Sequence, residues 1–408
     1  MKSFVLATLF IIGTGSSFGQ NINDNKVSFS FIQLPSVKID EDYSQYSMTV
    51  LHSYAEANED SLSVFEFRKQ AALQQFEIAA VNYIQLRDSL ERMHLRNLAT
   101  WEKQRNAGAL TATGQPIPKP NPPVFPQPPI YPNIKAPRLH SEIDDAAVTT
   151  AIKLQGYEVG ENEIVITVTL LPMRDIRIKE TKTGNGASTK YKYVCEYVLP
   201  IMLTLETPSQ GILMQNILFE NKKTYKMKDQ KSKYDHQIYM REHANTFYNE
   251  LERQARQEVI RATNTYLNEE VGFIKKTRKT EIYSVKKFKN YDYSDVTRAY
   301  SATVLALNLV GNDRDHSGAE DKLDEALAMW NEIMLESNTY DNKARINDKI
   351  SAMIQCNIAE IQMWQSKFGE ANATLDIIQN AGVLKGKNHA KSVRSFYANS
   401  ETRWNVNY

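Results

Sequence analysis

A proline-rich stretch constrains the fold of this chain more than any other feature of its sequence. Ten of the fourteen prolines lie between Pro116 and Pro137, in PIPKPNPPVFPQPPIYPNIKAP. Proline fixes φ and lacks a backbone N–H, so the stretch suits neither a helix interior nor a central strand. The sequence therefore predicts an extended, polyproline-like strap over residues 114–138. An alternative is that the strap is a ligand for an aromatic groove on a partner.

A long helix is predicted before the strap, from about Ser61 to Arg105. Apolar residues recur there at alternating steps of four and three, which is typical of a heptad seam; they are Ala72, Phe76, Ala79, Tyr83, Leu86, Leu90 and Met93. Such a helix reaches about 65 Å at ~1.5 Å per residue and needs a partner to cover its seam. The candidate partner is a second helix at about 237–270, whose similar spacing comes from Ala244, Tyr248, Leu251, Ala255, Ala262 and Tyr266.

The middle of the chain changes to the period of two that is typical of strands. A short helix capped by Ser141 and stopped by Gly156 precedes an antiparallel sheet built largely from residues 157–225. Two earlier strand-like runs, KVSFSFIQL and QYSMTVLHSY, are expected to join this sheet domain. The predicted fold class is therefore α+β, with a sheet domain and a long helical arm followed by an all-α region.

The C-terminal part resembles tetratricopeptide repeats. In NIAEIQMWQSKFGEANATLDII, the residues Ala359, Phe368, Ala371, Leu375 and Ile378 match the small and large packing positions of that helical hairpin. The stretch LDEALAMWNEIM resembles its second helix through Ala326, Trp330 and Ile333, although Ala326 and Ala371 are 45 residues apart rather than the usual 34. The resemblance implies helical hairpins and a protein-binding role.

The N-terminus predicts export. A single basic residue, Lys2, precedes an apolar run from Phe4 to Ile12 and small residues, as in a signal peptide cleaved before Gln20. A glutamine at that position resembles exported proteins of Bacteroidota. Removing residues 1–19 leaves equal numbers of basic and acidic residues, so no overall field attracts nucleic acid. A periplasmic or otherwise exported protein is expected, one that is not integral to a membrane; peripheral association with the envelope is left open.

One loop has the spacing of a calcium site. Counted from Asp313, oxygen-bearing residues fall at most of the positions that an EF-hand loop uses, with a glycine at position 6; they are Asp313, Asp315, Ser317, Asp321 and Asp324. However, Glu320 occupies a position that is normally apolar, and position 12 is an aspartate. The alternative is a solvated turn whose acids favour the N-terminus of the next helix. No other cofactor is expected.

Catalytic motifs are missing from the sequence. It contains no serine elbow, phosphate-binding glycine loop or zinc-protease histidine pair, and a noncatalytic role is therefore predicted. His236 and His243 are two turns apart on a predicted helix, which suits a metal only if further ligands join them. Cys195 and Cys356 are expected to be two separately buried thiols, the alternative being one long-range disulfide.

Two groups of residues each allow a structural and a functional interpretation. Tyr191, Tyr193 and Tyr197 share a strand face that either packs across the sheet or stacks on a sugar. Residues 221–233 and 275–290 are basic and either solvated or a patch for anionic lipid headgroups, glycan or acidic protein.

The expected organisation combines these elements in chain order. It consists of a signal peptide (1–19), strands with a helical arm (20–113), the strap (114–138), an α+β sheet domain (139–295) and a tetratricopeptide-like region (296–408). The favoured function is a scaffold or adaptor that binds other cell-envelope proteins in an outer-membrane or secretion assembly. A carbohydrate- or ligand-binding module and an envelope hydrolase are the alternatives.

Overall fold

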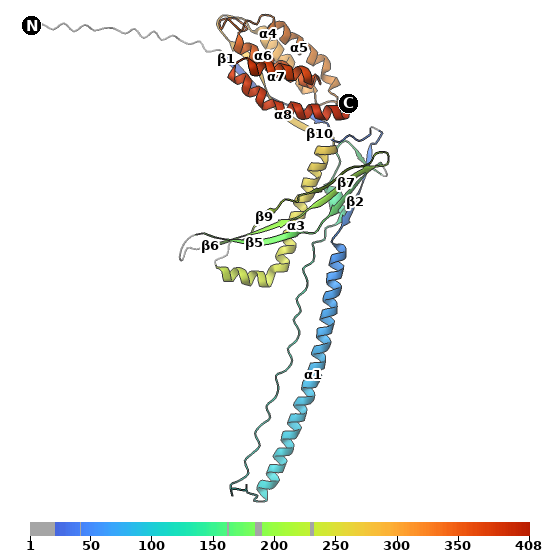
Figure 1. Ribbon diagram of the computed structural model, residues 1–408, viewed down its shortest axis with the longest axis vertical. Coiled ribbons are helices and arrows are strands. Elements are labelled where there is room, and N and C mark those ends of the chain that lie inside the picture. Colours follow the sequence, from blue (N-terminus) through green and yellow to red (C-terminus); the bar gives the residue numbers. More distant parts are fainter. Residues whose placement is uncertain (1–20, 41, 161–162, 184–189, 229–231) are drawn as a thin grey trace, which may run out of the picture.

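The protein is an α+β molecule with a body of sheets and helices from which one long helix projects (Figure 1). This computed structural model describes residues 21–40, 42–160, 163–183, 190–228 and 232–408. The predicted signal peptide, residues 1–19, lies outside the described residues. The α+β fold class predicted from the sequence is confirmed.

Within the described residues, the strands form three sheets rather than one. A five-stranded sheet has the order β3-β2-β4-β7-β8, a three-stranded sheet the order β5-β6-β9, and β1 pairs with β10 in a two-stranded ribbon. The bounds are β1 Asn21–Gln33, β2 Gln45–His52, β3 Glu158–Val159, β4 Ile164–Leu170, β5 Arg174–Thr183, β6 Lys190–Val198, β7 Ile201–Thr207, β8 Gly211–Leu218, β9 Lys223–Lys226 and β10 Ile274–Lys287.

The sheets differ from the predicted antiparallel sheet in two ways. First, β2 pairs in parallel with both β3 and β4, because the chain leaves for the long helix and strap before returning to the same sheet. Second, β1 does not join the other strands. It runs antiparallel to β10, with Asn21 opposite Lys287 and Gln33 opposite Ile274, and its apolar residues pack against the C-terminal helices.

Eight α-helices complete the described part of the chain. Their bounds are α1 Ala55–Asn106, α2 Asp145–Ala151, α3 Lys233–Val271, α4 Ser294–Leu309, α5 Glu320–Met334, α6 Asp348–Trp364, α7 Phe368–Asn380 and α8 Leu384–Asn407. The helix predicted after the strap begins and ends elsewhere than expected. Asp144, not Ser141, caps α2 by accepting from the Ala146 N–H, because the Ser141 hydroxyl donates instead to the Asn249 carbonyl. This helix also ends at Ala151, before Gly156.

Two hydrophobic cores hold the body together. The sheet core joins the five- and three-stranded sheets to one face of α3, and the C-terminal core joins the β1–β10 ribbon to α4–α8. Within the C-terminal core, Trp330 of α5 is fully buried, and its indole N–H donates to the Thr303 hydroxyl of α4 at 2.8 Å. A satisfied buried indole of this kind fixes how the two helices pack.

The helix α1 is continuous over 52 residues, which corresponds to about 78 Å at ~1.5 Å per residue. The prediction of one long helix is therefore confirmed, but the predicted pairing with residues 237–270 is wrong. That segment lies in α3, whose residues Leu251, Ala255 and Val259 are buried in the sheet core instead. The segment beside α1 is the proline-rich strap, which returns along it to the body (Figure 1). We call α1 and the strap together the arm.

Candidate interaction surfaces

The root of the arm is fixed by hydrogen bonds between the first turn of α1 and the end of the strap. The Asn58 amide donates to the His140 carbonyl at 3.1 Å and accepts from the His140 N–H at 2.8 Å. The Tyr54 hydroxyl, just before the helix, donates to the Ser141 carbonyl at 3.2 Å. Both Tyr54 and Asn58 are buried, so these bonds are shielded from water and hold the two chain segments in one register.

A buried ion network joins this root to α3. Glu252 is fully buried and accepts from Arg256 Nη2 at 2.6 Å, while His140 Nδ1 and Arg138 Nη2 lie 3.2 and 3.5 Å from its two oxygens. The Arg256 guanidinium also stacks on the Tyr54 ring, with its carbon 4.3 Å from the ring centroid. Charges of both signs thus meet at the point where helix, strap and sheet core join, which ties the base of the arm to the body.

The strap packs against α1 along one ridge of an extended helix. Every third residue is half-buried and the two between are exposed; the half-buried ones are Ile117, Pro120, Pro123, Pro126, Pro129 and Pro132. A repeat of three is the period of polyproline II. On α1, the half-buried positions opposite include Phe76, Ala80, Tyr83, Leu90 and Leu98. Because the strap covers only one side, it takes the place predicted for a partner helix and leaves the rest of α1 open.

Two contacts hold the strap farther along the arm. The Trp101 indole N–H donates to the Ile117 carbonyl at 2.8 Å near the tip, and the rings of Phe76 and Tyr131 meet edge to face with centroids 5.2 Å apart. Helix and strap also match in length. From Asn58 to Trp101 the helix rises about 65 Å, and from Ile117 to His140 a polyproline chain spans about 71 Å.

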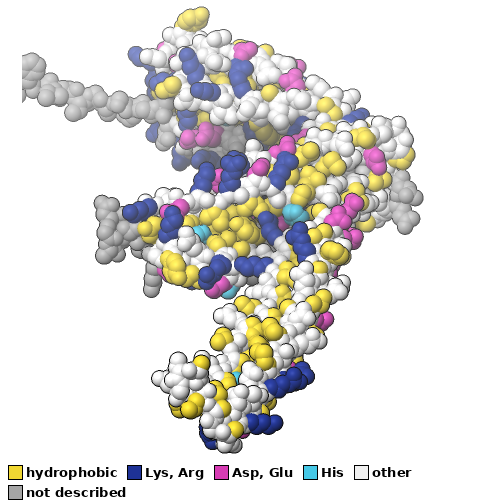
Figure 2. Space-filling model, turned by 60° about the horizontal axis from the view of Figure 1, so that its bottom comes forward, with side chains coloured by type: hydrophobic (Ala, Val, Ile, Leu, Met, Phe, Trp, Pro, Cys, Tyr) yellow, Lys and Arg dark blue, Asp and Glu magenta, His cyan; other side chains and the backbone are white. Residues whose placement is uncertain are grey.

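The uncovered sides of the arm carry large apolar side chains (Figure 2). Phe67 is 74% exposed and Ile78 56%, and on the strap Val124 and Ile130 are about nine-tenths exposed. The further exposed apolar residues of α1 are Leu62, Val64, Val81, Ile84, Leu86, Met93 and Leu95. Apolar side chains grouped in this way on a projecting element are typical of a protein-binding surface.

The C-terminal helices pack as successive neighbours, α4 with α5, α6 with α7 and α7 with α8. The residues that carry the resemblance to tetratricopeptide repeats are buried in this core; they are Ala326, Trp330, Ile333, Ala359, Phe368, Ala371, Leu375 and Ile378. They therefore serve packing between helices, and any partner would meet the outer faces of the hairpins.

The loop with calcium-like spacing forms a turn before α5. Asp315 accepts from both the backbone N–H and the hydroxyl of Ser317, at 3.1 and 2.8 Å, and Asp324 accepts from the Gln365 amide at 2.7 Å. At its centre His316 adopts a left-handed φ of 63° and packs its ring against Trp364. Within the described part of the chain, no group of three or more His, Cys, Asp or Glu side chains could hold a metal ion. Calcium binding by Asp313, Asp315, Ser317, Asp321 and Asp324 stays a prediction.

The remaining chemical candidates from the sequence lie apart and in packed surroundings. The His236 ring stacks on Tyr193 with centroids 3.6 Å apart, and His243 packs beside Tyr239. Cys195 and Cys356 are free and buried in the sheet core and the C-terminal core respectively, as two separate thiols. Burial raises the pKa of both, that of Cys195 to about 11, which disfavours the reactive thiolate.

The tyrosine row is largely a packing feature. Tyr193 and Tyr197 are buried in the sheet core, and Tyr191 is half-buried beside them. The two basic stretches also lie apart, because β9 belongs to the three-stranded sheet and β10 to the ribbon, with α3 between them in the chain. Among the described helices, none combines the length and the apolar character needed to cross a membrane.

Sequence reasoning missed the groups that hold the arm to the body. Glu252 and Arg256 are four residues apart on the face of α3 that also buries Leu251, Ala255 and Val259. A charged pair at helical spacing inside an apolar stripe could have predicted a buried ion pair from the sequence. The pairing of Asn58 with His140, by contrast, has no local signal. Comparison with protein-family models, with curated proteins and with solved structures finds no match to this chain.

Proposed function

We propose that the protein is a noncatalytic scaffold or adaptor that uses its arm to bind other cell-envelope proteins. The observation that carries the proposal is the helix of about 78 Å with large apolar side chains exposed along it. Exposing this surface costs free energy in water, and a protein partner that covers it would recover that cost. The proline strap supports the same role, because it stiffens the arm without covering all of it.

The proposed location follows from the predicted signal peptide. An exported protein with an arm of this length would act in the periplasm or at the envelope surface, for example in an outer-membrane or secretion assembly. The tetratricopeptide-like hairpins would offer a second protein-binding surface. Of the alternatives, we favour the adaptor over the carbohydrate-binding module because Tyr193 and Tyr197 are buried. An envelope hydrolase stays the second alternative, which no catalytic motif in the sequence supports.

Photocrosslinking in cells that make the protein tests the proposal. A benzophenone amino acid would replace Phe67 on the arm or, as the matched control, Tyr340, an aromatic residue of the C-terminal region that is fully exposed. We expect a defined crosslinked protein from position 67 and none of the same mass from position 340. Equal labelling from both positions, or none from position 67, would contradict the proposal.

Removal of the arm gives an independent test. Because Asn58 and His140 are hydrogen-bonded at its root, residues 62–135 can be replaced by a short Gly-Ser turn without disturbing the body. The shortened protein should keep its C-terminal unfolding transition and lose the partner. Retention of the partner would place binding elsewhere. Turnover of a cell-wall substrate, abolished by one acid or histidine substitution, would favour the hydrolase instead.

A further inference from the structure

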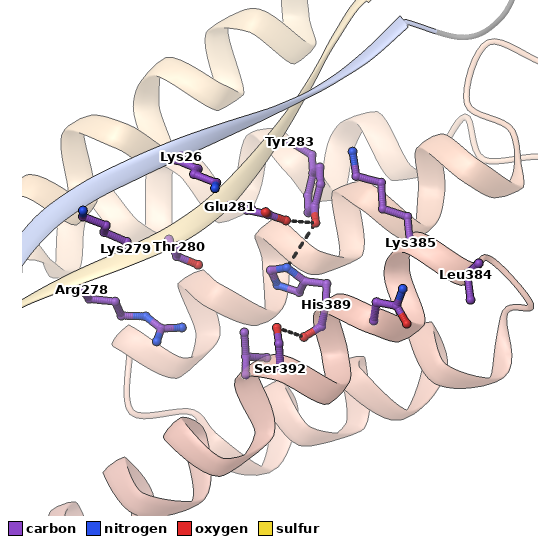
Figure 3. Close-up of a pocket in the computed structure, with 12 residues that line it drawn as sticks. Lys26, Arg278, Lys279, Thr280, Glu281, Tyr283, Leu384, Lys385, His389 and Ser392 are labelled. Atoms are coloured by element: carbon purple, nitrogen blue, oxygen red, sulfur yellow. Dashed lines mark hydrogen bonds between the residues drawn. The ribbon is translucent and has the colours of Figure 1, made fainter. Parts of the chain in front are cut away.

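A basic cavity lies where the β1–β10 ribbon meets the start of α8 (Figure 3). Its volume is about 730 Å³, and four cationic side chains line it: Lys26 from β1, Arg278 and Lys279 from β10, and Lys385 from α8. The carboxylate of Glu281 lines it as well, and Glu281 stands opposite Lys26 in the strand ladder. The predicted arm function does not involve this cavity.

The positive charge of the basic cavity is only partly compensated. Arg278 makes a bidentate ion pair with Glu360, and Lys385 lies 3.2 Å from an oxygen of Asp24. Lys26 and Lys279 are exposed and add further positive charge. The N-terminus of α8 opens on the same cavity, and no side chain caps its first turn. Lysines around one cavity, beside the positive end of a helix, favour an anion.

A buried histidine beside the cavity indicates that the anion should also carry a hydrogen-bond donor. His389 is 6% exposed, and its Nδ1 lies 3.3 Å from the Tyr283 hydroxyl oxygen, which itself donates its proton to Glu281 at 2.8 Å. The hydroxyl has one proton, so its oxygen accepts from the Nδ1–H of His389. The other ring nitrogen, Nε2, then carries a lone pair.

That lone pair has nothing to accept from. In the part of the chain that the structure describes, Nε2 of His389 is buried and has no hydrogen-bond partner. Burial lowers the pKa of His389, which keeps the ring neutral near pH 7. A buried acceptor without a donor costs free energy, and a ligand O–H would remove that cost once a small shift of the ring opened Nε2 to the cavity. Glu281 would accept from the same kind of group.

We propose that the basic cavity binds a phosphate group that retains one ionisable O–H, as inorganic phosphate and phosphate monoesters do. The lysines that line the cavity attract its charged oxygens, while its hydroxyl donates to Glu281 or, after a shift of the buried ring, to His389. Sulfate and phosphodiesters carry similar oxygens but no O–H, so the acceptors in the cavity select against them. The cavity volume exceeds that of one phosphate, which leaves room for the group esterified to it.

Calorimetric titration of the full mature chain at pH 6.5 and constant ionic strength tests the proposal. The probes are inorganic phosphate, glycerol 3-phosphate and sulfate. We expect heat from the first two and at least about tenfold weaker binding of sulfate, because sulfate leaves the acceptors unpaired. Equal affinity for sulfate and phosphate, or no heat with either phosphate probe, overturns the proposal.

Two lysine variants locate the site on the chain. Lys279→Gln removes a lining charge, whereas Lys275→Gln removes the same charge from the same face of β10, outside the cavity. The first should weaken phosphate binding roughly five- to tenfold, and the second should leave it unchanged. Both side chains are exposed, so neither change should unfold the protein. Equal loss in the two variants would mean nonspecific attraction and would overturn the proposal.

Vesicle flotation distinguishes the two sources of such a phosphate. Phosphatidic acid presents a monoester on a membrane, and phosphatidylglycerol presents a diester of the same sign of charge. Flotation with phosphatidic acid alone, lost in Lys279→Gln, assigns the site to a lipid headgroup. Binding of glycerol 3-phosphate without flotation assigns it to a free metabolite. Equal flotation with both lipids contradicts selection through the O–H.

Discussion

Replacing Glu360 by glutamine removes the counterion at the centre of the C-terminal core. Five donors converge on its carboxylate: Arg278 Nε and Nη2 at 2.8 and 2.9 Å, the Thr280 hydroxyl at 3.0 Å, the Trp364 indole at 3.0 Å and the Tyr397 hydroxyl at 3.1 Å. These residues come from β10, α6 and α8. The side chain of Glu360 is fully buried, so water cannot replace any donor that is lost.

The magnitude follows from what glutamine cannot accept. Two of the donors meet one carboxylate oxygen and three meet the other, so the glutamine NH₂ group faces at least two donors in either orientation. Arg278 also keeps its charge with no counterion. Breaking a buried ion pair in this way costs about 3–5 kcal/mol. Burial would raise the pKa of Glu360, but Arg278 above all lowers it to about 2 from 4.5, which corresponds to about 3 kcal/mol.

Urea unfolding at pH 7, followed by tryptophan fluorescence, measures the effect, since Trp330 and Trp364 lie in this core. The matched control is Glu325→Gln, which breaks an exposed pair with Lys322 and should change the free energy of unfolding by less than about 0.5 kcal/mol. A loss below about 1 kcal/mol for Glu360→Gln would refute the reasoning.

The pH dependence gives a second check on the same variant. The pKa of Glu360 is lower in the folded protein than its ordinary value of 4.5. Its stabilising contribution is therefore complete above about pH 4.5 and is lost as the pH falls toward 2. The difference between the original protein and the variant should shrink over that interval. A difference that stays constant from pH 5 to pH 2.5 would mean that the carboxylate charge is not its source.

Three further predictions concern other parts of the molecule. Trp101→Phe removes the hydrogen bond to Ile117 and should speed protease cleavage of the strap while changing the free energy of unfolding by only about 1 kcal/mol; unchanged cleavage would contradict the pairing of helix and strap. Burial lowers the pKa of His236, His316 and His389 below 6.5, so the unfolded chain binds more protons and the urea midpoint should fall as the pH drops from 7.5 to 5.5, whereas a rise would refute this. Calorimetric titration with calcium should give heat that Asp313→Ala abolishes if the loop is a metal site, and no heat would leave it a turn.

The long helix was predictable because its signal is local. Apolar residues at heptad spacing, such as Phe76, Tyr83 and Leu90, determine a helix whatever covers them. What covers them was not predictable, since a second helix and a polyproline strap both present an apolar ridge. The sequence reasoning chose α3, whose spacing is similar, but the strands compete for its apolar face and bury it in the sheet core.

The ribbon and the basic cavity were missed for a different reason. β10 reads IKKTRKTEIYSVKK, and its many charges hid a strand of 14 residues; among the strands that the structure describes, it pairs with β1 alone. The two strands are separated by some 250 residues of sequence, and no local pattern predicts such a pairing. The cavity depends on it, because Lys26 and Lys279 meet α8 only after the ribbon has formed.

The helix and the strap of the arm have different repeats, but one repeat of each covers nearly the same length. The arm can therefore be shortened or lengthened by whole repeats. Two turns of α1, seven residues, rise about 10.5 Å, and one turn of the strap, three residues, extends about 9.3 Å. Removing seven residues from the helix and three from the strap therefore shortens the arm by about 10 Å and returns each facing ridge to its former orientation. The hydrogen bonds of Asn58 at the root and of Trp101 near the tip would both survive. The length of the arm therefore sets a fixed distance between the body and whatever binds at the tip. Related chains that bridge a different distance would differ from this one by paired deletions or insertions, seven residues in the helix with three in the strap.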